Sequence, residues 1–369
     1  PVAKPVAKPV AKPVAKPVVF KHNFNLNIFS DILVLHTGEK DNALAHIKIW
    51  YPYFVESGVN FIILTRFIEA YNEVVKEYPE ANVVFAKNKK ETDMLFDSFV
   101  SIKACFYPSN TGKNSHLLYQ THIKHIFIGH GDSDKMSSIR KYFRVYDENW
   151  VAGDAHIDRF KNAGFSQNRL KHIKVGRPTL KEIVHVATNS WQTRFKDKYN
   201  VLYLSTWEGT LKEQDYSSLE IIQDNLCFIK NIENVSISIK SHPFSGNREI
   251  EFKSFENILS KNEFLKIHSR LEPLKEHIIN SNIFICDISG VVSECLAANA
   301  PIFLYIPKHK EITIAKSNMP YEEYCYIYST PEELKEKITA VLNGDDYLAE
   351  NRLKAIDYII GLEETKNNN

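Results

Sequence analysis

Residues 283–294 read Ile-Phe-Ile-Cys-Asp-Ile-Ser-Gly-Val-Val-Ser-Glu. The apolar run 283–286 is typical of a strand buried on both faces of a parallel sheet, and Ser289-Gly290 open a helical segment. The first turn of such a helix offers backbone amides and a positive dipole end to an anion. The stretch therefore predicts an α/β fold with an anion site at a strand end, where Asp287 and Ser289 would also cap the helix.

The same alternation of short apolar runs and helical stretches continues on both sides of this segment, from Phe20 onward. It predicts strands at 32–35, 59–64, 82–85, 123–128, 149–151, 201–204, 235–239, 282–286 and 301–305. Helical stretches are expected between them, at 66–78, 217–230 and 291–298 among others. This pattern is typical of parallel α/β sheets.

The length of 369 residues exceeds what one hydrophobic core usually supports, which predicts two domains. We place an N-terminal Rossmann-like domain at 20–180 and a C-terminal one at 181–369, with the last helices packing back on the first. The boundary follows Val175-Gly176-Arg177-Pro178, where Gly and Pro end a strand. The fold class is α/β, with two Rossmann-like domains facing each other across a cleft that receives the strand ends.

Composition excludes several classes of protein. Hydrophobic residues at 44% and charged residues at 25% fit a soluble globular protein, and no apolar run approaches membrane-helix length. With 46 Lys and Arg against 45 Asp and Glu, the chain is too balanced for a protein devoted to nucleic acid. Five widely spaced cysteines without a CxxC pair predict buried thiols in a reducing compartment, so we expect a cytoplasmic location.

Residues 1–19 form a separate region. Pro1–Lys16 is four copies of Pro-Val-Ala-Lys, and proline at every fourth position removes donors that a helix or sheet needs. We expect an extended or disordered arm without an apolar signal-peptide core. The favoured interpretation is a plain spacer. The alternative is a peripheral contact with anionic lipid on the inner face of the membrane, through the four lysines.

His130 is the first candidate catalytic residue. The apolar run 126–128 delivers it between Gly129 and Gly131, and Asp132, Ser133, Asp134 and Lys135 follow. Flanking glycines permit close approach of a substrate, and imidazole titrates near neutral pH, as a general base must. A histidine in an ordinary glycine turn is the alternative interpretation.

A second candidate lies at the end of the predicted strand 235–239, where Lys240-Ser241-His242-Pro243 follow. Lysine beside histidine suits an anionic ligand such as a diphosphate. A satisfied turn histidine is the alternative here. Thr206-Trp207, at the end of strand 201–204, forms a weaker nucleotide-binding candidate.

Taken in order, these motifs resemble the bacterial CDP-glycerol glycerophosphotransferase family, which includes teichoic acid and capsule polymerases of the GT-B fold. The resemblance covers roughly residues 123–305. It rests on His130-Gly131 with Lys135, Val175-Gly176-Arg177-Pro178, Thr206-Trp207, Lys240-Ser241-His242-Pro243, Asp287-Ile288-Ser289-Gly290-Val291 and Ala300-Pro301-Ile302-Phe303-Leu304-Tyr305.

The resemblance implies transfer of a polyol phosphate from a CDP-linked donor to a hydroxyl of a polymer or glycan, in cell-envelope biosynthesis. It implies His130 and His242 as the essential histidines. Donor binding would involve Lys240, Thr206, Trp207 and the segment 287–291, including Asp287, Ser289, Gly290 and Val291. We assign Gly131, Asp132, Lys135 and Arg177 to substrate binding. Two departures from the family pattern are Gly290 in place of a second serine and the acidic Asp132-Ser133-Asp134.

No carboxylate cluster has the spacing of metal ligands, so we expect no dedicated metal site and no required cofactor, although a loosely held Mg²⁺ is compatible with the chemistry. Two other functions stay open. One is a GT-B glycosyltransferase or sugar-nucleotide epimerase, which would share the fold and the phosphate-binding helix. The other is a non-catalytic protein, a transferase that has lost activity.

Overall fold

The computed structural model describes residues 20–22, 26–27, 29–131, 134, 136–166, 168, 170–196, 198–209, 215–246, 265–270 and 272–367. The chain divides into two compact units, residues 1–125 and 126–369. We describe each unit by itself. The repeat arm Pro1–Lys16 lies outside the described residues. The boundary predicted near residue 180 lies within the second unit and stays a prediction.

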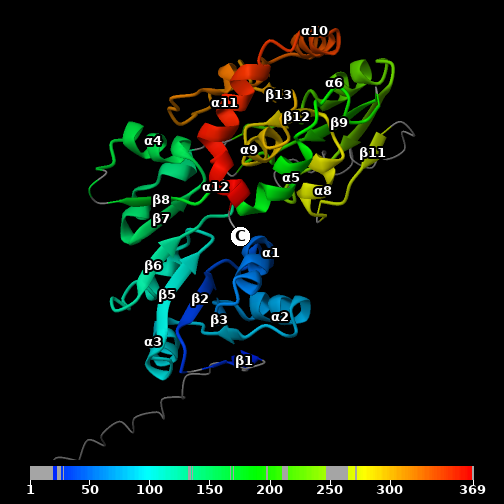
Figure 1. The fold of residues 1–369 in the computed structure, drawn as a ribbon. Helices are drawn as coiled ribbons and strands as arrows, with labels where there is room; N and C mark the ends of the chain where they lie inside the picture. Colours follow the sequence, from blue (N-terminus) through cyan, green and yellow to red (C-terminus); the bar gives the residue numbers. More distant parts are fainter. Residues whose placement is uncertain are drawn as a thin grey trace, which may run out of the picture. The chain divides into compact units, whose positions relative to one another are not determined.

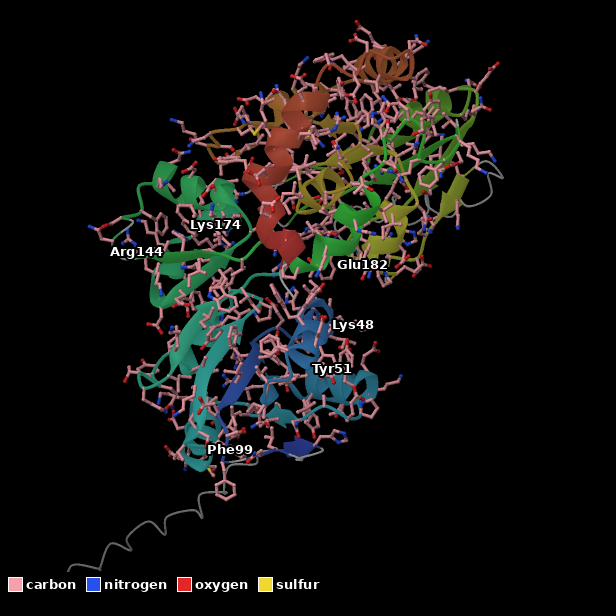
Figure 2. The ribbon with its side chains drawn as sticks, viewed as in Figure 1. Lys48, Tyr51, Phe99, Arg144, Lys174 and Glu182 are labelled. Carbon is pink, nitrogen blue, oxygen red and sulfur yellow. The ribbon has the colours of Figure 1, made fainter. Side chains whose placement is uncertain are left out.

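The first unit contains five strands in the order β1-β4-β3-β2-β5. The inner pairs are parallel and β1 runs antiparallel to β4. The strands are β1 (Phe20–His22), β2 (Ile32–Thr37), β3 (Phe61–Thr65), β4 (Val83–Phe85) and β5 (Ile102–Tyr107), and the helices are α1 (Ala43–Glu56), α2 (Ile68–Glu77) and α3 (Lys89–Ser98). Tyr51 of α1, labelled in Figure 2, stacks on Tyr78 with ring centroids 3.9 Å apart. This contact fixes α1 against the end of α2.

The second unit contains two parallel arrangements of strands. One is β6-β7-β8, and the other is a six-stranded sheet in the order β11-β10-β9-β12-β13-β14. The strands are β6 (Lys124–Phe127), β7 (Glu148–Val151), β8 (Lys171–Lys174), β9 (Tyr199–Leu204), β10 (Val235–Ile239), β11 (Leu265–Ile267), β12 (Ile283–Asp287), β13 (Ile302–Tyr305) and β14 (Tyr326–Tyr328). The six-stranded order is that of a doubly wound nucleotide-binding sheet.

Helices of the second unit surround these strands (Figure 1). They are α4 (Asp154–Asn162), α5 (Lys181–Val186), α6 (Ile222–Ile229), α8 (Leu274–Ile279), α9 (Val291–Leu296), α10 (Pro331–Leu342), α11 (Ala349–Ile360) and α12 (Leu362–Asn367). Helix α11 packs against both α9 and α4. Gly153 permits the second contact, because a Cβ there would lie 2.4 Å from the Tyr358 carbonyl oxygen.

The strand from which the sequence analysis began is central in this sheet. β12 lies between β9 and β13, and all of its residues are buried. A parallel strand covered by helices on both faces shows no alternation of polar and apolar residues, which explains the continuous run Ile283–Cys286. All five cysteines are free thiols; four are buried, as expected, and Cys227 is exposed.

A buried ion pair fixes the start of α11. Arg352 is 1% exposed, and its Nη1 and Nη2 donate to the two carboxylate oxygens of Asp346 at 2.9 and 2.6 Å. The Tyr326 hydroxyl and the Trp191 indole also donate to this carboxylate, at 2.7 and 2.9 Å. Burial opposes ionisation, but these hydrogen bonds outweigh it and lower the pKa of Asp346. One carboxylate thus joins α11, β14 and the segment before β9.

We predict that Asp346→Asn destabilises the protein by about 3–5 kcal/mol at pH 7, because Arg352 would be left buried without its carboxylate. The pKa of Asp346 is lowered by folding, so the wild-type advantage is complete above the unfolded pKa of about 4 and is lost as pH falls through the folded value. Urea denaturation between pH 7 and pH 2 measures both effects. The exposed neighbour provides the control, Asp345→Asn, and equal losses in the two variants would contradict the prediction.

Candidate functional site

The two central strands of the six-stranded sheet define the candidate site. β9 lies between β10 and β12, and the strand order reverses at the β9–β12 pair. In doubly wound sheets, ligands bind outside the carboxyl ends of the strands at this reversal. Thr206 and Trp207 follow β9, Lys240 and His242 follow β10, and Asp287 ends β12. The fold therefore places these predicted residues at one edge of one sheet.

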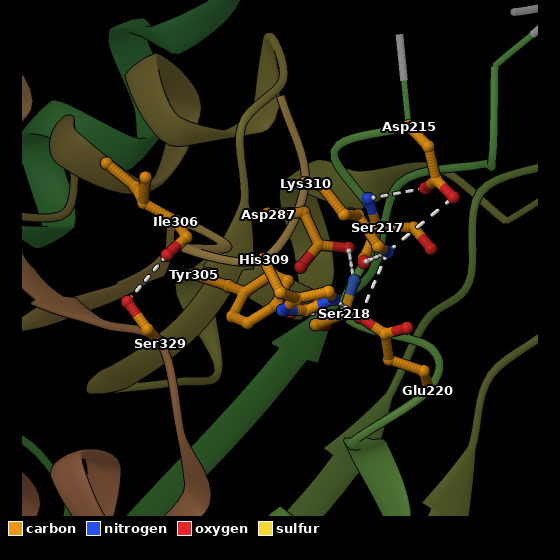
Figure 3. A network of polar contacts seen from close by, with 10 residues as sticks. All are labelled: Asp215, Ser217, Ser218, Glu220, Asp287, Tyr305, Ile306, His309, Lys310 and Ser329. Atoms are coloured by element: carbon orange, nitrogen blue, oxygen red, sulfur yellow. Dashed lines mark hydrogen bonds and ion pairs between the residues drawn. The ribbon is translucent and has the colours of Figure 1, made fainter. Parts of the chain in front are cut away.

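Asp287 is the central polar residue of this edge and is completely buried. Its Oδ2 accepts a hydrogen bond from the backbone amide of Thr206 at 2.7 Å. It also accepts from the backbone amide of Ser218 at 3.1 Å (Figure 3). The carboxylate thus ties the loop after β9 to the end of β12. These contacts give Asp287 a role in positioning the backbone. If its carboxylate faced a diphosphate, the two negative charges would repel each other.

The helix cap that we expected from Asp287 or Ser289 is absent. α9 has Gly290 as its N-cap, and no side chain caps it by a hydrogen bond. The Ser289 hydroxyl donates to the Asp287 carbonyl oxygen at 3.4 Å. The capping prediction is therefore wrong. The Asp287 carboxylate accepts the amides of Thr206 and Ser218 instead, and the Ser289 hydroxyl donates to a carbonyl oxygen before the helix begins. With only six residues, α9 also has its two dipole ends close together, which weakens the predicted contribution of the dipole.

His242 lies in an aromatic group after β10. Its ring stacks on Trp207, with centroids 6.3 Å apart and an interplanar angle of 20°, and Phe244 lies against both rings. The Phe244 backbone amide donates to His242 Nδ1 at 3.1 Å. Since Nδ1 accepts, a neutral His242 carries its proton on Nε2. The side chain is therefore prepared to donate a hydrogen bond from Nε2.

Lys240 is 8% exposed, and its Nζ donates to the Arg270 carbonyl oxygen at 2.9 Å. Burial lowers the pKa of Lys240, against the attraction of Glu272 and Glu294. Burial also raises the pKa of Glu294, against the attraction of Arg177 and Lys240. The structure thus places two predicted cations, Arg177 and Lys240, around the first turn of α9.

Glu294 was missed as a site residue by the sequence analysis, although it stands in the segment that was quoted first. Its partners are more than fifty residues away along the chain, so no local spacing indicates the group. The backbone amide of Arg177 donates to the Thr365 hydroxyl at 2.8 Å, which fixes this residue against α12. The segment 175–178 therefore meets the last helix of the chain.

A network of charged and polar side chains lies beside Asp287 and supports the loops after β9 and β13 (Figure 3). Glu220 Oε1 accepts from the Tyr305 hydroxyl at 3.1 Å, lies 2.8 Å from His309 Nε2, and pairs with Lys310 Nζ at 3.0 Å. Lys310 Nζ also lies 3.6 Å from a carboxylate oxygen of Asp215. These contacts were not predicted and hold the 215–220 loop.

His130 is exposed in the loop after β6, next to Gly129, whose φ of +65° is in the region that favours glycine. Gly131 is also exposed, and a Cβ there would meet no atom within 4 Å. Asp132, Ser133 and Lys135 lie outside the described residues. The space around Gly131 fits the predicted close approach of a substrate, while the roles of His130 and Gly131 stay predictions.

Asp134 is buried, although it belongs to an acidic loop segment. Its Oδ1 lies 2.8 Å from Arg159 Nε, and both side chains are nearly buried. The pair borders a cavity of about 20 Å³ that Ser289, Ser293 and Tyr321 also line. This cavity has room for about one water molecule. It is therefore too small for a nucleotide.

A polar group at the strand ends of the first unit was also missed. His36 is buried near the end of β2, and its Nδ1 lies 3.1 Å from the Leu64 carbonyl oxygen. Arg66, 1% exposed, donates from Nε to the Ala86 carbonyl oxygen and approaches His116 Nδ1 with Nη2 at 2.9 Å. Burial and the charge of Arg66 lower the pKa of His36 well below its usual value. These contacts brace the strand ends of the first unit.

Among the described residues, every helix is too short or too polar to cross a bilayer.

The doubly wound sheet, with histidine and lysine at its carboxyl edge, places the chain among α/β enzymes of the GT-B-like class. The sequence model of the CDP-glycerol:poly(glycerophosphate) glycerophosphotransferase family matches residues 113–369. The chain therefore belongs to this family. The predictions of family, fold class and transferase activity are confirmed.

Solved structures share the fold. A variant of the wall teichoic acid polymerase TagF aligns with a TM-score of 0.61 and 17% identity, covering 93% of this chain and 87% of that one. A TagF variant soaked with CDPG gives 0.62 and 15%, covering 94% and 88%. The UDP-GlcNAc 2-epimerase of Methanocaldococcus jannaschii gives 0.52 and 14%, covering 89% and 99%. At these identities the likeness shows the fold alone. A search of curated proteins finds no match.

We predict that Asp287→Ala destabilises the protein by roughly 1–3 kcal/mol for each of the two amides that lose their acceptor. Asp287→Asn should cost less, because its carbonyl oxygen still accepts. Urea denaturation at pH 7 measures the difference, with Asp224→Ala, an exposed change on α6, as the control. Wild-type stability in Asp287→Ala would show that the carboxylate does not hold the loop.

Proposed function

We propose that the chain moves a glycerol phosphate from CDP-glycerol to a hydroxyl of a cell-envelope polymer or glycan. The observation that carries this proposal is the group Trp207, Lys240 and His242 at the carboxyl edge of the doubly wound sheet, in a member of this family. A solved structure of TagF soaked with CDPG, whose fold this chain shares, supports the choice of donor.

The proposed reaction is an in-line displacement at the β-phosphorus. The acceptor oxygen forms a bond to that phosphorus while the bond to the bridging oxygen breaks, so CMP leaves with inversion at phosphorus. His130 takes the proton of the acceptor hydroxyl, which is the role of a general base. The protein otherwise has to position the two substrates and neutralise charge on the phosphoryl oxygens.

On the donor side, His242 donates from Nε2 to a phosphate oxygen, a role that its Nδ1 contact with the Phe244 amide supports. Lys240 and Arg177 supply positive charge, and the Ser289 hydroxyl and the amides of Gly290 and Val291 supply hydrogen bonds. Because α9 is short, we assign more of the charge stabilisation to the cations than to its dipole. Thr206 and Trp207 contact the nucleotide.

On the acceptor side, we assign Gly131, Asp132 and Lys135 to binding. Lys135 would attract the phosphates of a polyanionic acceptor, whereas the carboxylate of Asp132 would select against excess negative charge at that point. The proposed chemistry uses no dedicated metal or other cofactor, and Mg²⁺ bound by the diphosphate itself is compatible with it.

We predict a different loss for each histidine. His130→Ala should lower kcat for CMP release by about 10²–10⁴-fold with little change in CDP-glycerol affinity, as expected for removal of a general base. His242→Ala should mainly raise the KM for the donor, since its partner is the diphosphate. Steady-state kinetics and direct donor binding separate the two, and His122→Ala, an exposed change before β6, is the control.

UDP-GlcNAc, tested with release of UDP and formation of its 2-epimer as readouts, addresses the epimerase and glycosyltransferase alternatives. Turnover of UDP-GlcNAc but not of CDP-glycerol would contradict the proposed donor. Wild-type kinetics in both histidine variants would show that neither residue has its proposed role.

We further propose a cytoplasmic location, in which the Pro1–Lys16 arm is a spacer. The alternative is a peripheral contact of the arm with anionic lipid. Each lysine near such a surface contributes about 1 kcal/mol, which makes the contact of four lysines reversible and sensitive to salt. Proline at every fourth position keeps the arm from adding to a packed core.

We predict that deletion of Pro1–Lys16 leaves folding and CMP release with a soluble acceptor unchanged. If the arm contacts lipid, co-sedimentation with phosphatidylserine vesicles should weaken on deletion, and the binding of the full chain should fade between about 50 and 300 mM salt as the screening length shortens. Replacement of the four lysines by glutamine, with the prolines retained, is the matched control. Unchanged binding in both variants would overturn the lipid contact, and loss of folding on deletion would overturn the spacer.

A further inference from the structure

Three potential metal ligands meet beside the Lys240 loop, outside the residues assigned to the reaction. They are His268, which follows β11, Glu272, and His277 on α8. One ligand atom from each lies within 4.8 Å of the other two. The His-x₃-Glu-x₄-His spacing stands in the sequence, but the sequence analysis did not single it out.

The distances fit a shared ion. Glu272 Oε2 lies 3.0 Å from His277 Nε2 and 3.6 Å from His268 Nδ1. Ligand atoms at about 2.0–2.1 Å from a tetrahedral Zn²⁺ are about 3.3 Å apart. The two distances from Glu272 are therefore close to the spacing of ligands on one ion.

The two imidazoles are shielded from solvent, whereas the carboxylate is not. His277 Nε2 is buried and lies close to the Glu272 carboxylate. The side chains of His268 and His277 are 9% and 14% exposed, while that of Glu272 is 46% exposed and open to solvent.

The surroundings of both imidazoles oppose a positive charge on them, although Glu272 acts in the other direction. Burial is the main cause that lowers the pKa of His268 and of His277, and the charges of Lys240 and Lys266 add to it. The two ring centroids are 3.8 Å apart, so protonation of one ring opposes protonation of the other. Neutral imidazole is the ligand form of histidine, and Glu272 supplies a compensating negative charge.

We propose that His268, Glu272 and His277 bind one Zn²⁺ ion. Two imidazoles and one carboxylate suit Zn²⁺ better than Mg²⁺, which prefers oxygen ligands, and leave a fourth position for water. The ion would fix the segment that supports Lys240: the Arg270 carbonyl oxygen accepts from Lys240 Nζ, and Arg270 Nη1 donates to the Ser245 carbonyl oxygen at 2.6 Å. This inference does not depend on the proposed reaction.

The test is Zn²⁺ binding by the full chain, after removal of metal with a chelator. Each protein carries Cys227→Ser, because the exposed thiol is itself a zinc ligand. We expect one Zn²⁺ per chain by equilibrium dialysis and elemental analysis, and a rise in Tm on adding Zn²⁺. Co²⁺ in place of Zn²⁺ should give the visible absorption of a low-coordinate site.

His268→Gln and His277→Gln should each weaken Zn²⁺ binding by at least about 100-fold and abolish the rise in Tm. His309→Gln is the matched control, because His309 pairs with Glu220 on the surface outside the cluster. Glu272→Gln provides a ligand change at an exposed position, should either histidine variant fail to fold. Circular dichroism in chelator checks the folding of each protein.

One Zn²⁺ that is lost in the cluster variants and kept in His309→Gln supports the proposal. No bound Zn²⁺ in the wild type, or binding that persists in all three cluster variants, overturns it and leaves a polar cluster of histidines and glutamate. Since none of these measurements uses CMP release, their outcome is separate from that of the proposed reaction.

Discussion

The Asp287 carboxylate is the constraint on which the arrangement of the donor-side residues depends. It is completely buried, and it accepts the amides of Thr206 and Ser218 across the reversal between β12 and β9. A buried charge without partners would cost several kcal/mol, so the two amides and the carboxylate require one another. The loop after β9 is therefore held by the same residue that ends β12. This explains how a central strand ends in an acid at the edge where we propose that an anionic ligand binds.

Further contacts extend from this point to the residues that we assign to the donor. Trp207 follows Thr206 and stacks on His242, whose turn is fixed by the Phe244 amide. Glu208 adds a second link, because its buried carboxylate accepts the Gly246 amide at 2.7 Å. The loops after β9 and β10 are thus joined twice, by ring stacking and by a charged hydrogen bond. Preorganised loops lose less entropy when a ligand binds, which favours affinity for a small anionic donor.

The sequence predicts the central strands well and the edges poorly. The strand 235–239 was predicted with its observed bounds, and 282–286 was shifted by one residue from β12. Buried parallel strands have continuous apolar runs, which makes them visible. β8 reads Lys-His-Ile-Lys and β11 has three residues, so neither gives a periodic signal. β5, Ile-Lys-Ala-Cys-Phe-Tyr, was missed although five of its six residues are apolar or aromatic and it pairs with β2. Glu294 and the histidine–glutamate cluster were missed because tertiary packing, not local pattern, brings their partners together.

Burial determines the pKa shifts of the charged residues at the carboxyl edge of the six-stranded sheet. Burial lowers the pKa of Lys240. The carbonyl oxygen of Arg270 accepts from one of the three N–H donors of the Lys240 ammonium group. Glu294 lies in the field of both Lys240 and Arg177, and its own pKa is raised by burial. An arriving diphosphate brings negative charge to the cations and disfavours ionised Glu294. Donor binding should therefore favour the protonated forms of Lys240 and Glu294, because the negative charge of the diphosphate would raise the pKa of each group. The edge thus combines Lys240 and Arg177, the cations that we assign to the donor, with a carboxyl group whose pKa burial raises.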